Sequence, residues 1–152
     1  MTKPERRTIA ERALAGYAGA VADELDLPRD AVLAEVSDTA AVYLPLARRC
    51  VRYPGRDLML VWSGRRGWSV ALESTPRRPL EVIAYFGDEE RFPQPHAVAS
   101  FVEAALDHDG VTRAPEFPVA DLEETVERRL GRFAGQDLPE SGFPASRDSI
   151  AL

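Results

Sequence analysis

The chain has little cysteine, little lysine and no long hydrophobic run. Cys50 is the single cysteine among 152 residues, so an internal disulfide is excluded, which suits a reducing cytosol. No window of about 18 consecutive apolar residues occurs, which excludes a membrane-spanning helix of ordinary length. The first residues are charged and lead into an amphipathic segment, so a secretory signal is not expected. We therefore expect a cytoplasmic protein.

The sequence also lacks the short motifs of common nucleotide-binding and hydrolytic sites. It has no P-loop, no dinucleotide-binding glycine fingerprint and no Gly-x-Ser-x-Gly elbow. His96 follows Pro95 at an expected helix start, where a surface or capping role is more common than general-base work. His108 lies in an Asp-His-Asp-Gly cluster that ends a helix, and consecutive side chains there point in different directions. We expect no catalytic residue, no metal site and no cofactor.

Two further groups of residues allow alternative interpretations. Cys50 has arginine neighbours that favour a reactive cysteine, whereas its strand-like surroundings favour a small buried residue. Glu73 and Glu81 lie on neighbouring expected strands, where they would either form a pair of catalytic carboxylates or face solvent. Neither pattern is specific to one chemistry.

Charge is distributed unevenly along the chain. The net charge is −6, and Lys3 is the single lysine among 19 basic residues. Residues 41–87 contain eight arginines and three acidic residues, a net charge of +5 that leaves −11 for the remainder. Internal complementarity and solvated turns explain such a basic middle, and an anion-binding face is the alternative. The acidic total, without aromatic residues interleaved among the arginines, disfavours nucleic-acid binding.

Thr8 to Leu25 has the pattern of an amphipathic helix. Its apolar stripe recurs at intervals of three and four residues: Leu14, Tyr17, Ala18, Val21, Ala22 and Leu25. Thr8 and Glu11 are spaced as a capping box at the helix start. Pro28 ends the helix, because the residue before a proline avoids the α conformation.

From Ala31 to Phe86 the apolar period changes to two, which predicts β-strands. The expected strands span residues 31–36, 41–51, 57–63, 68–74 and 80–86. Short connections rich in glycine and proline favour an antiparallel meander, because a parallel crossover needs about a dozen residues. Pro45 cannot donate to a strand ladder, which places its strand at a sheet edge or at a bulge.

Two helices are expected after the strands. Pro95 suits the first turn of a helix that ends at Gly110. A third helix spans about residues 120–134, with acidic residues in its first turns and arginines near its end, as the helix dipole prefers. Residues 136–152 have no apolar period and are predicted to form a flexible or loosely docked tail.

Together these patterns predict an α+β fold. An N-terminal helix, an antiparallel meander of four to five strands, a helix and an additional C-terminal amphipathic helix would form a two-layer sandwich. We expect one domain at residues 8–134, with its core at 8–110 and the appended helix at 119–134.

Trp62 and Trp68 flank a glycine-bracketed pair of arginines, Arg65 and Arg66. Alternate strand residues share a face, and joining the most apolar rows of the two strands requires an odd number of loop residues. Trp62 then pairs with Trp68 on the buried face, which contributes on the order of 1 kcal/mol beyond burial. The tryptophans are expected to be a structural pair, with the arginines outside as a charged tip.

Alternate turns of a meander lie at the same end of its sheet. This arrangement gathers one set of arginines at one end: Arg52, Arg56, Arg77 and Arg78. Guanidinium groups bind phosphate and carboxylate bidentately, so this set is a candidate site for an anion or a partner. Arg65 and Arg66 are further candidates for binding an anion or a partner, and they would lie at the opposite end, where the acidic loop 88–90 would neutralise them.

Two motifs resemble signatures of a known family. The first is Asp-Leu-Met-Leu-Val-Trp at 57–62 followed by Gly-Trp-Ser-Val-Ala-Leu-Glu at 67–73, and the second is Phe-Pro-Gln-Pro-His-Ala-Val-Ala-Ser-Phe-Val at 92–102. They resemble an uncharacterised actinobacterial family of unknown function, of the DUF6292 type, over about residues 12–110. The resemblance implies a domain boundary and no activity, so no catalytic residue is carried over. At the level of the fold, the layout is also similar to type III secretion chaperones, which bind protein partners.

Two functions are consistent with these features. The first is a non-enzymatic regulatory or adaptor module that binds a protein partner or a second copy of itself, through residues 119–134 or the open edge near Pro45. The second is a binder of a small anionic metabolite, or an enzyme acting on one, with the arginine set as its clamp. A pocket lined by those arginines would favour the second function.

Overall fold

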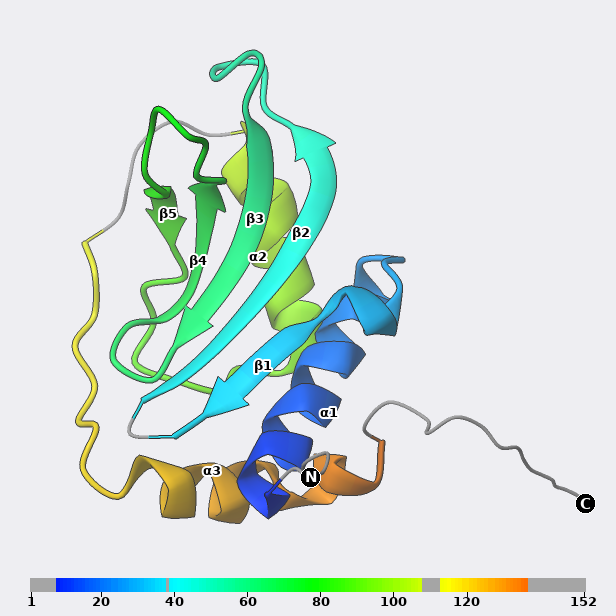
Figure 1. Ribbon diagram of the computed structural model, residues 1–152, viewed down its shortest axis with the longest axis vertical. Coiled ribbons are helices and arrows are strands. Elements are labelled where there is room, and N and C mark those ends of the chain that lie inside the picture. Colours follow the sequence, from blue (N-terminus) through cyan, green and yellow to red (C-terminus); the bar gives the residue numbers. More distant parts are fainter. Residues whose placement is uncertain (1–7, 38, 108–112, 137–152) are drawn as a thin grey trace, which may run out of the picture.

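The computed structural model describes residues 8–37, 39–107 and 113–136. Its elements follow in the order α1 (Ile9–Glu24), η1 (Arg29–Ala31), β1 (Leu33–Val36), β2 (Ala40–Arg49), β3 (Asp57–Ser63), β4 (Gly67–Leu72), β5 (Glu81–Tyr85), α2 (Pro95–Asp107), α3 (Leu122–Leu130) and η2 (Gly131–Gln136). The fold is therefore α+β, as predicted (Figure 1). None of the helices in these ranges is both long and apolar enough to cross a membrane. The predicted helix end at Gly110 and the predicted tail from residue 137 onward lie outside the described residues.

The strands form one antiparallel sheet in the order β1-β2-β3-β4-β5, so the predicted meander is confirmed. β1 begins at Leu33 rather than near Ala31, because residues 29–31 form a 3₁₀ turn directly after Pro28. β2 ends at Arg49, two residues before the predicted end at residue 51.

Pro45 lies at a break in the ladder of β2. β1 pairs with residues 40–43 of β2, so Pro45 has no strand partner on that side within the described residues. Between Pro45 and Arg49 the register to β3 shifts, and Ala47 adopts a φ of 56°. A bulge bends the strand and tolerates a residue without a backbone donor. β2 is therefore not an edge strand, because β1 pairs with its first residues; Pro45 lies beyond that pairing and beside a bulge, in agreement with the second of the two predicted placements.

One face of the sheet carries the core. Figure 1 shows α1 and α2 on the same side of the sheet, behind the strands in that view. Alternate residues of the central strands point to this side and are at most 1% exposed: Val42, Leu44, Leu58, Leu60, Trp62, Trp68, Val70 and Leu72. The helices meet them with residues that are equally buried: Leu14, Tyr17, Val21, Val98 and Val102.

The predicted capping box fixes the start of α1. The Thr8 hydroxyl accepts a hydrogen bond from the Glu11 N–H at 3.0 Å, and the Glu11 carboxylate accepts one from the Thr8 N–H at 3.2 Å. The second oxygen of Glu11 lies 3.5 Å from the Val36 nitrogen, which connects the helix start to the end of β1.

α3 and η2 lie across α1 (Figure 1). Their apolar side chains are buried: Leu122, Val126, Leu130 and Phe133. At Gly16 the segments meet so closely that a Cβ would lie 1.9 Å from the carbonyl oxygen of Phe133. The apolar stripe of residues 119–134, one of the two expected partner-binding surfaces, is therefore covered within the chain.

Candidate interaction surface

The register of β3 and β4 pairs Trp62 directly with Trp68 across the three-residue turn 64–66. The indole N–H of Trp62 donates to the Arg91 carbonyl oxygen at 2.9 Å, and its ring stacks on Phe92 at 5.5 Å between centroids. The Trp68 N–H donates to the Tyr17 hydroxyl at 3.0 Å. Both indoles are covered and hydrogen-bonded inside the chain, so they are not available as a ligand platform.

The opposite face of the sheet, here called the open face, consists of four rows of residues that run across the strands. The central rows are the Val61 row (Leu33, Tyr43, Val61, Ser69 and Tyr85) and the Met59 row (Pro45, Met59, Ala71 and Val82). The outer rows are the Glu35 row (Glu35, Ala41, Ser63 and Gly67) and the Arg49 row (Arg49, Asp57 and Glu73). Each name is used for its row below.

No helix among the described residues covers the open face, which points toward the viewer in Figure 1. Leu33 is 53% exposed, and Tyr43, Met59, Val61, Val82 and Tyr85 are half-buried. Ser69 and Ala71 are buried although they belong to this face, because the larger side chains around them shield them. An uncovered face of an antiparallel sheet ordinarily carries polar side chains. The central rows instead form a contiguous apolar surface, which is typical of an interaction site.

Charged groups bound the open face at its two ends. In the Arg49 row, the Arg49 guanidinium lies 2.9 Å from the Asp57 carboxylate, and both side chains are more than half exposed. Glu35, at the other end, is exposed. The apolar centre is thus flanked by a mixed pair at one end and by a carboxylate at the other.

The arginines of the predicted anion site lie in the two turns at the Arg49 end. Arg52 donates to the Ala105 carbonyl oxygen at 3.1 Å, and Arg56 donates to the Glu73 carbonyl oxygen at 3.0 Å. Arg56 also lies 3.9 Å from the Glu81 carboxylate, and its Nε and Nη1 atoms are buried without a hydrogen-bond partner. Arg77 and Arg78 are exposed and make no ion pair with another described residue. Two of the four guanidinium groups are therefore engaged inside the chain.

Arg65 and Arg66 lie at the opposite end of the sheet, as expected, with a different acidic partner. Both contact Glu116, at 3.6 and 3.4 Å, rather than the acidic loop 88–90. The Phe117 N–H donates to the Arg65 carbonyl oxygen at 2.8 Å, which brings the segment before α3 against this turn. Sequence pattern alone could not place Glu116, because it lies in a segment without a period.

Glu90, from the acidic loop, instead binds α3. Its carboxylate accepts hydrogen bonds from the Phe92 N–H at 2.8 Å and from the Arg129 guanidinium at 2.9 Å. Burial by itself raises the pKa of Glu90, but these two donors outweigh burial and lower the pKa below its usual range. Burial, and secondarily the nearby Arg129, lowers the pKa of Arg91, which donates to the Gly64 carbonyl oxygen at 2.9 Å.

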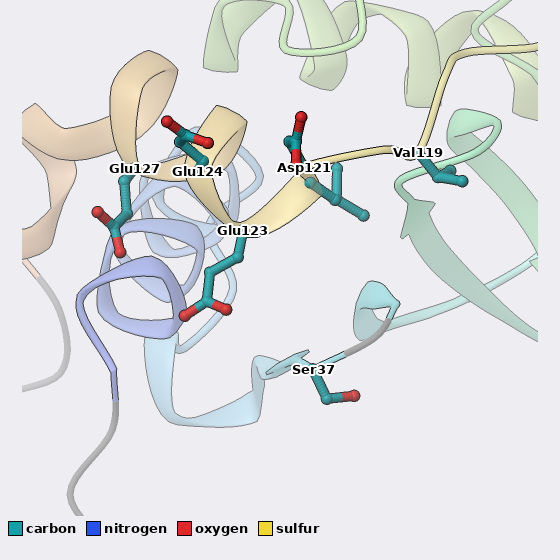
Figure 2. A pocket seen from close by; sticks show the side chains of 7 residues that line it. Ser37, Val119, Asp121, Glu123, Glu124 and Glu127 are labelled. Atoms are coloured by element: carbon teal, nitrogen blue, oxygen red, sulfur yellow. The ribbon is translucent and has the colours of Figure 1, made fainter.

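Two adjoining cavities lie between α3 and the turns of the sheet. The larger, of about 440 Å³, is lined by Ser37, Val119, Asp121, Leu122, Glu123, Glu124 and Glu127. Figure 2 shows that its four carboxylates point in different directions. No group of histidine, cysteine and acidic residues in the described parts of the chain is arranged to hold a metal ion. The smaller cavity, of about 290 Å³, is lined mainly by apolar atoms, with Arg65 and Arg66 at its rim.

The remaining chemical candidates have ordinary surroundings. Cys50 is 3% exposed, and its sulfur lies 3.7 Å from the Leu106 carbonyl oxygen, as for a small buried residue. Glu81 is exposed and contacts Arg56, and Glu73 is half-buried. His96 is exposed at the start of α2, and His108 lies outside the described residues.

A family model described as a family of unknown function, DUF6292, matches residues 17–104, more than half of the 152 residues. The match is shorter than the expected 12–110, and it leaves α3 and η2 outside. It includes all five strands, and with them the open face. We found no matching curated protein and no matching solved structure.

Proposed function

The chain belongs to this family of unknown function, and from that premise we propose that it is a cytoplasmic regulatory or adaptor module that binds protein through the open face. The proposal assigns it no catalytic centre. The observation that carries the proposal is the contiguous apolar surface of the Val61 and Met59 rows, which the described helices leave uncovered.

Burying this apolar surface against a protein partner is favoured by the hydrophobic effect. Apolar area removed from water contributes roughly 25 cal/mol per Å² before the costs of association are subtracted. Side chains such as Tyr43 and Met59 supply broad apolar contacts, and tyrosine and methionine are enriched in protein interfaces. The stripe of α3 offers no comparable surface, because it already packs within the chain.

Binding of an anionic metabolite by the arginine set has less support. Arg52 and Arg56 already donate to carbonyl oxygens, and the unpaired nitrogens of Arg56 have no surface that a solute could reach. None of these four arginines lines either of the two cavities between α3 and the sheet, and Arg65 and Arg66 at the rim of the smaller cavity both contact Glu116. A measured binding isotherm for a phosphorylated or carboxylated metabolite, abolished by Arg77→Ala with Arg78→Ala, would restore this alternative.

Site-specific photo-crosslinking in the native host tests the proposal. A photoreactive phenylalanine analogue at Tyr43 should crosslink a defined protein species, whereas the same residue at Val51, which is 94% exposed in a turn, should not. The crosslink at Tyr43 should disappear when Val61→Lys is added, and it should form again when the identified species is purified and mixed with the protein. Equal crosslinking at both positions, or none at Tyr43, would contradict the proposal.

A further inference from the structure

We propose that the smaller cavity between α3 and the sheet, of about 290 Å³, binds a monocarboxylate with a short aliphatic tail. The carboxylate would lie at the turn of Arg65 and Arg66, and the tail would fill the apolar interior of the cavity. This inference goes beyond the proposed function, because it assigns a small-molecule site outside the central rows of the open face.

The turn of Arg65 and Arg66 already holds one carboxylate, that of Glu116. One Glu116 oxygen lies 3.6 Å from the Arg65 guanidinium, and the other lies 3.4 Å from the Arg66 guanidinium. The two arginines thus form a site that takes one carboxylate oxygen each. All three side chains are at least 41% exposed, so the contact is weak, and exposed side chains change rotamer rapidly. A ligand carboxylate can therefore replace that of Glu116.

The cavity that both arginines line is formed mainly by apolar atoms. Ala40 and Leu122 are 3% and 4% exposed in its walls, whereas Val119 is 42% exposed. An aliphatic tail would cover these side chains, and each methylene that it removes from water strengthens binding. Ligand pockets of about 300–1,000 Å³ combine such apolar walls with a few polar groups. This cavity lies at the small end of that range, so we expect a short tail.

Hydrogen bonds hold the walls of the cavity together. The Gly64 N–H donates to the Ala40 carbonyl oxygen at 3.1 Å, which joins two of the turns. Arg91 donates to the Gly64 carbonyl oxygen at 2.9 Å and to the Pro118 carbonyl oxygen at 2.5 Å, so the segment that leads into Val119 is fixed against the same turn. A site that is formed before the ligand enters loses less conformational entropy on binding.

Charge determines which way the ligand points. Four carboxylates line the adjoining larger cavity: Asp121, Glu123, Glu124 and Glu127 (Figure 2). These groups repel an anionic head, which leaves the arginine end of the smaller cavity for the carboxylate. An alkylammonium ion of the same length would be attracted to the acidic end, so it is the ligand that the experiment has to distinguish.

An NMR titration of the full isotope-labelled chain with hexanoate tests the inference, because it reports affinity and position together. The amide signals of Gly64, Gly67 and Leu122 should shift and saturate, with a dissociation constant on the order of 1 mM. Each methylene lost from the tail should weaken binding about four-fold, so butanoate should bind roughly fifteen-fold more weakly. Hexanamide and hexylammonium have a similar tail without the carboxylate, and each should bind at least about ten-fold more weakly than hexanoate.

Three variants test the carboxylate end of the site. Glu116→Gln removes the competing carboxylate and should tighten hexanoate binding by about two- to five-fold. Arg65→Gln combined with Arg66→Gln should weaken hexanoate binding at least about ten-fold. Arg77→Gln combined with Arg78→Gln is the matched control, because it removes the same charge from exposed arginines of another turn, and it should leave the affinity within about two-fold.

Several results would overturn the inference. They are the absence of saturating shifts at about 20 mM hexanoate, shifts confined to amides away from this cavity, and equally tight binding of hexanamide or hexylammonium. An affinity unchanged by Glu116→Gln, or by the paired change at Arg65 and Arg66, would also overturn it. If the paired variant loses its folded spectrum, Arg65→Gln alone replaces it and should still weaken binding. The crosslink at Tyr43 depends on none of these results, so the proposed function is tested separately.

Discussion

The Tyr17 hydroxyl joins α1 to β4, because it lies 3.0 Å from the indole nitrogen of Trp68 and both side chains are at most 1% exposed. The hydroxyl accepts the Trp68 N–H and donates to the Pro93 carbonyl oxygen at 2.5 Å, so it also holds the segment before α2. The pKa of Tyr17 is raised well above its usual value of 10, mainly because the side chain is buried. The hydroxyl therefore stays protonated and can donate at any physiological pH.

Replacing this hydroxyl should destabilise the fold. Tyr17→Phe leaves the Trp68 N–H and the Pro93 carbonyl oxygen buried without a partner, which costs about 1–3 kcal/mol. The measurement is the free energy of unfolding in urea. Tyr43→Phe is the matched control, because its hydroxyl makes no hydrogen bond with the described residues, and it should change stability by less than about 0.5 kcal/mol. Equal effects of the two changes would mean that the Tyr17 bonds contribute nothing.

The contact at Gly16 predicts that α3 and η2 cannot tolerate a methyl group there. Gly16→Ala would place a Cβ 1.9 Å from the Phe133 carbonyl oxygen, so η2 must move away from α1. We expect a loss of about 1–3 kcal/mol in stability, as for other overpacked sites. In the Gly16→Ala variant, amide hydrogen exchange should become faster than in the unaltered protein, and the increase should be largest in residues 122–136. Gly131 is the control, because a Cβ there meets nothing within 4 Å, and Gly131→Ala should be neutral or slightly stabilising. Similar losses of stability at both glycines would argue against the close contact at Gly16.

The two tryptophans should give one buried fluorescence signal. Trp62 and Trp68 are the only tryptophans, and they are 0% and 1% exposed. The native emission should be shifted to shorter wavelength than that of free tryptophan and resist quenching by iodide. A long-wavelength, readily quenched emission from the folded protein would show that the indoles are open to water.

The Glu90 contacts predict a modest acid dependence of stability. Because the pKa of Glu90 is lowered in the folded state, its contribution is present above the usual value of 4.5 and is lost as the pH falls through the folded pKa. Both side chains of the Glu90–Arg129 pair are about two-fifths exposed, so Glu90→Gln should cost about 0.5 kcal/mol at pH 7 after solvent screening. The difference from the unaltered protein, measured by urea unfolding, should shrink as the pH falls below 4.5 and vanish once the pH lies below the folded pKa. Glu89→Gln is the control, and it should leave the free energy of unfolding unchanged at pH 7 and in acid. A loss of stability in Glu90→Gln that persists in acid would exclude this explanation.

Local patterns in the sequence were sufficient for most of the fold. The capping box at Thr8, the meander and the break at Pro45 each depend on neighbouring residues or on a missing N–H, and each is present. The direct pairing of Trp62 with Trp68 followed from alternation in β3 and β4. Each of these features depends on residues close together in the sequence, so a single sequence was enough to predict them.

The candidate surface was harder to anticipate, because it depends on what covers each face. The alternation that places Trp62 and Trp68 on the buried face leaves Met59 and Val61 on the other face, and it does not assign Tyr43 and Tyr85 to the same surface. The register brings all four into adjoining rows. Apolar residues alternating on both sides of β2 and β3 were the available signal. The Glu116 partner of Arg65 and Arg66 left no periodic signal, because long-range ion pairs depend on loop paths.

The methyl group of Met59 offers the most direct test of the claim that the open face is a binding surface. The chain contains two methionines, Met1 and Met59, so methyl-labelled methionine gives a spectrum in which Met59 reports from the centre of this face. When the crosslinked partner is added, the Met59 signal should shift and lose its sensitivity to a soluble paramagnetic agent. The Val61→Lys variant should suppress both changes. A Met59 signal that keeps its position and its full sensitivity after the partner is added would contradict the account.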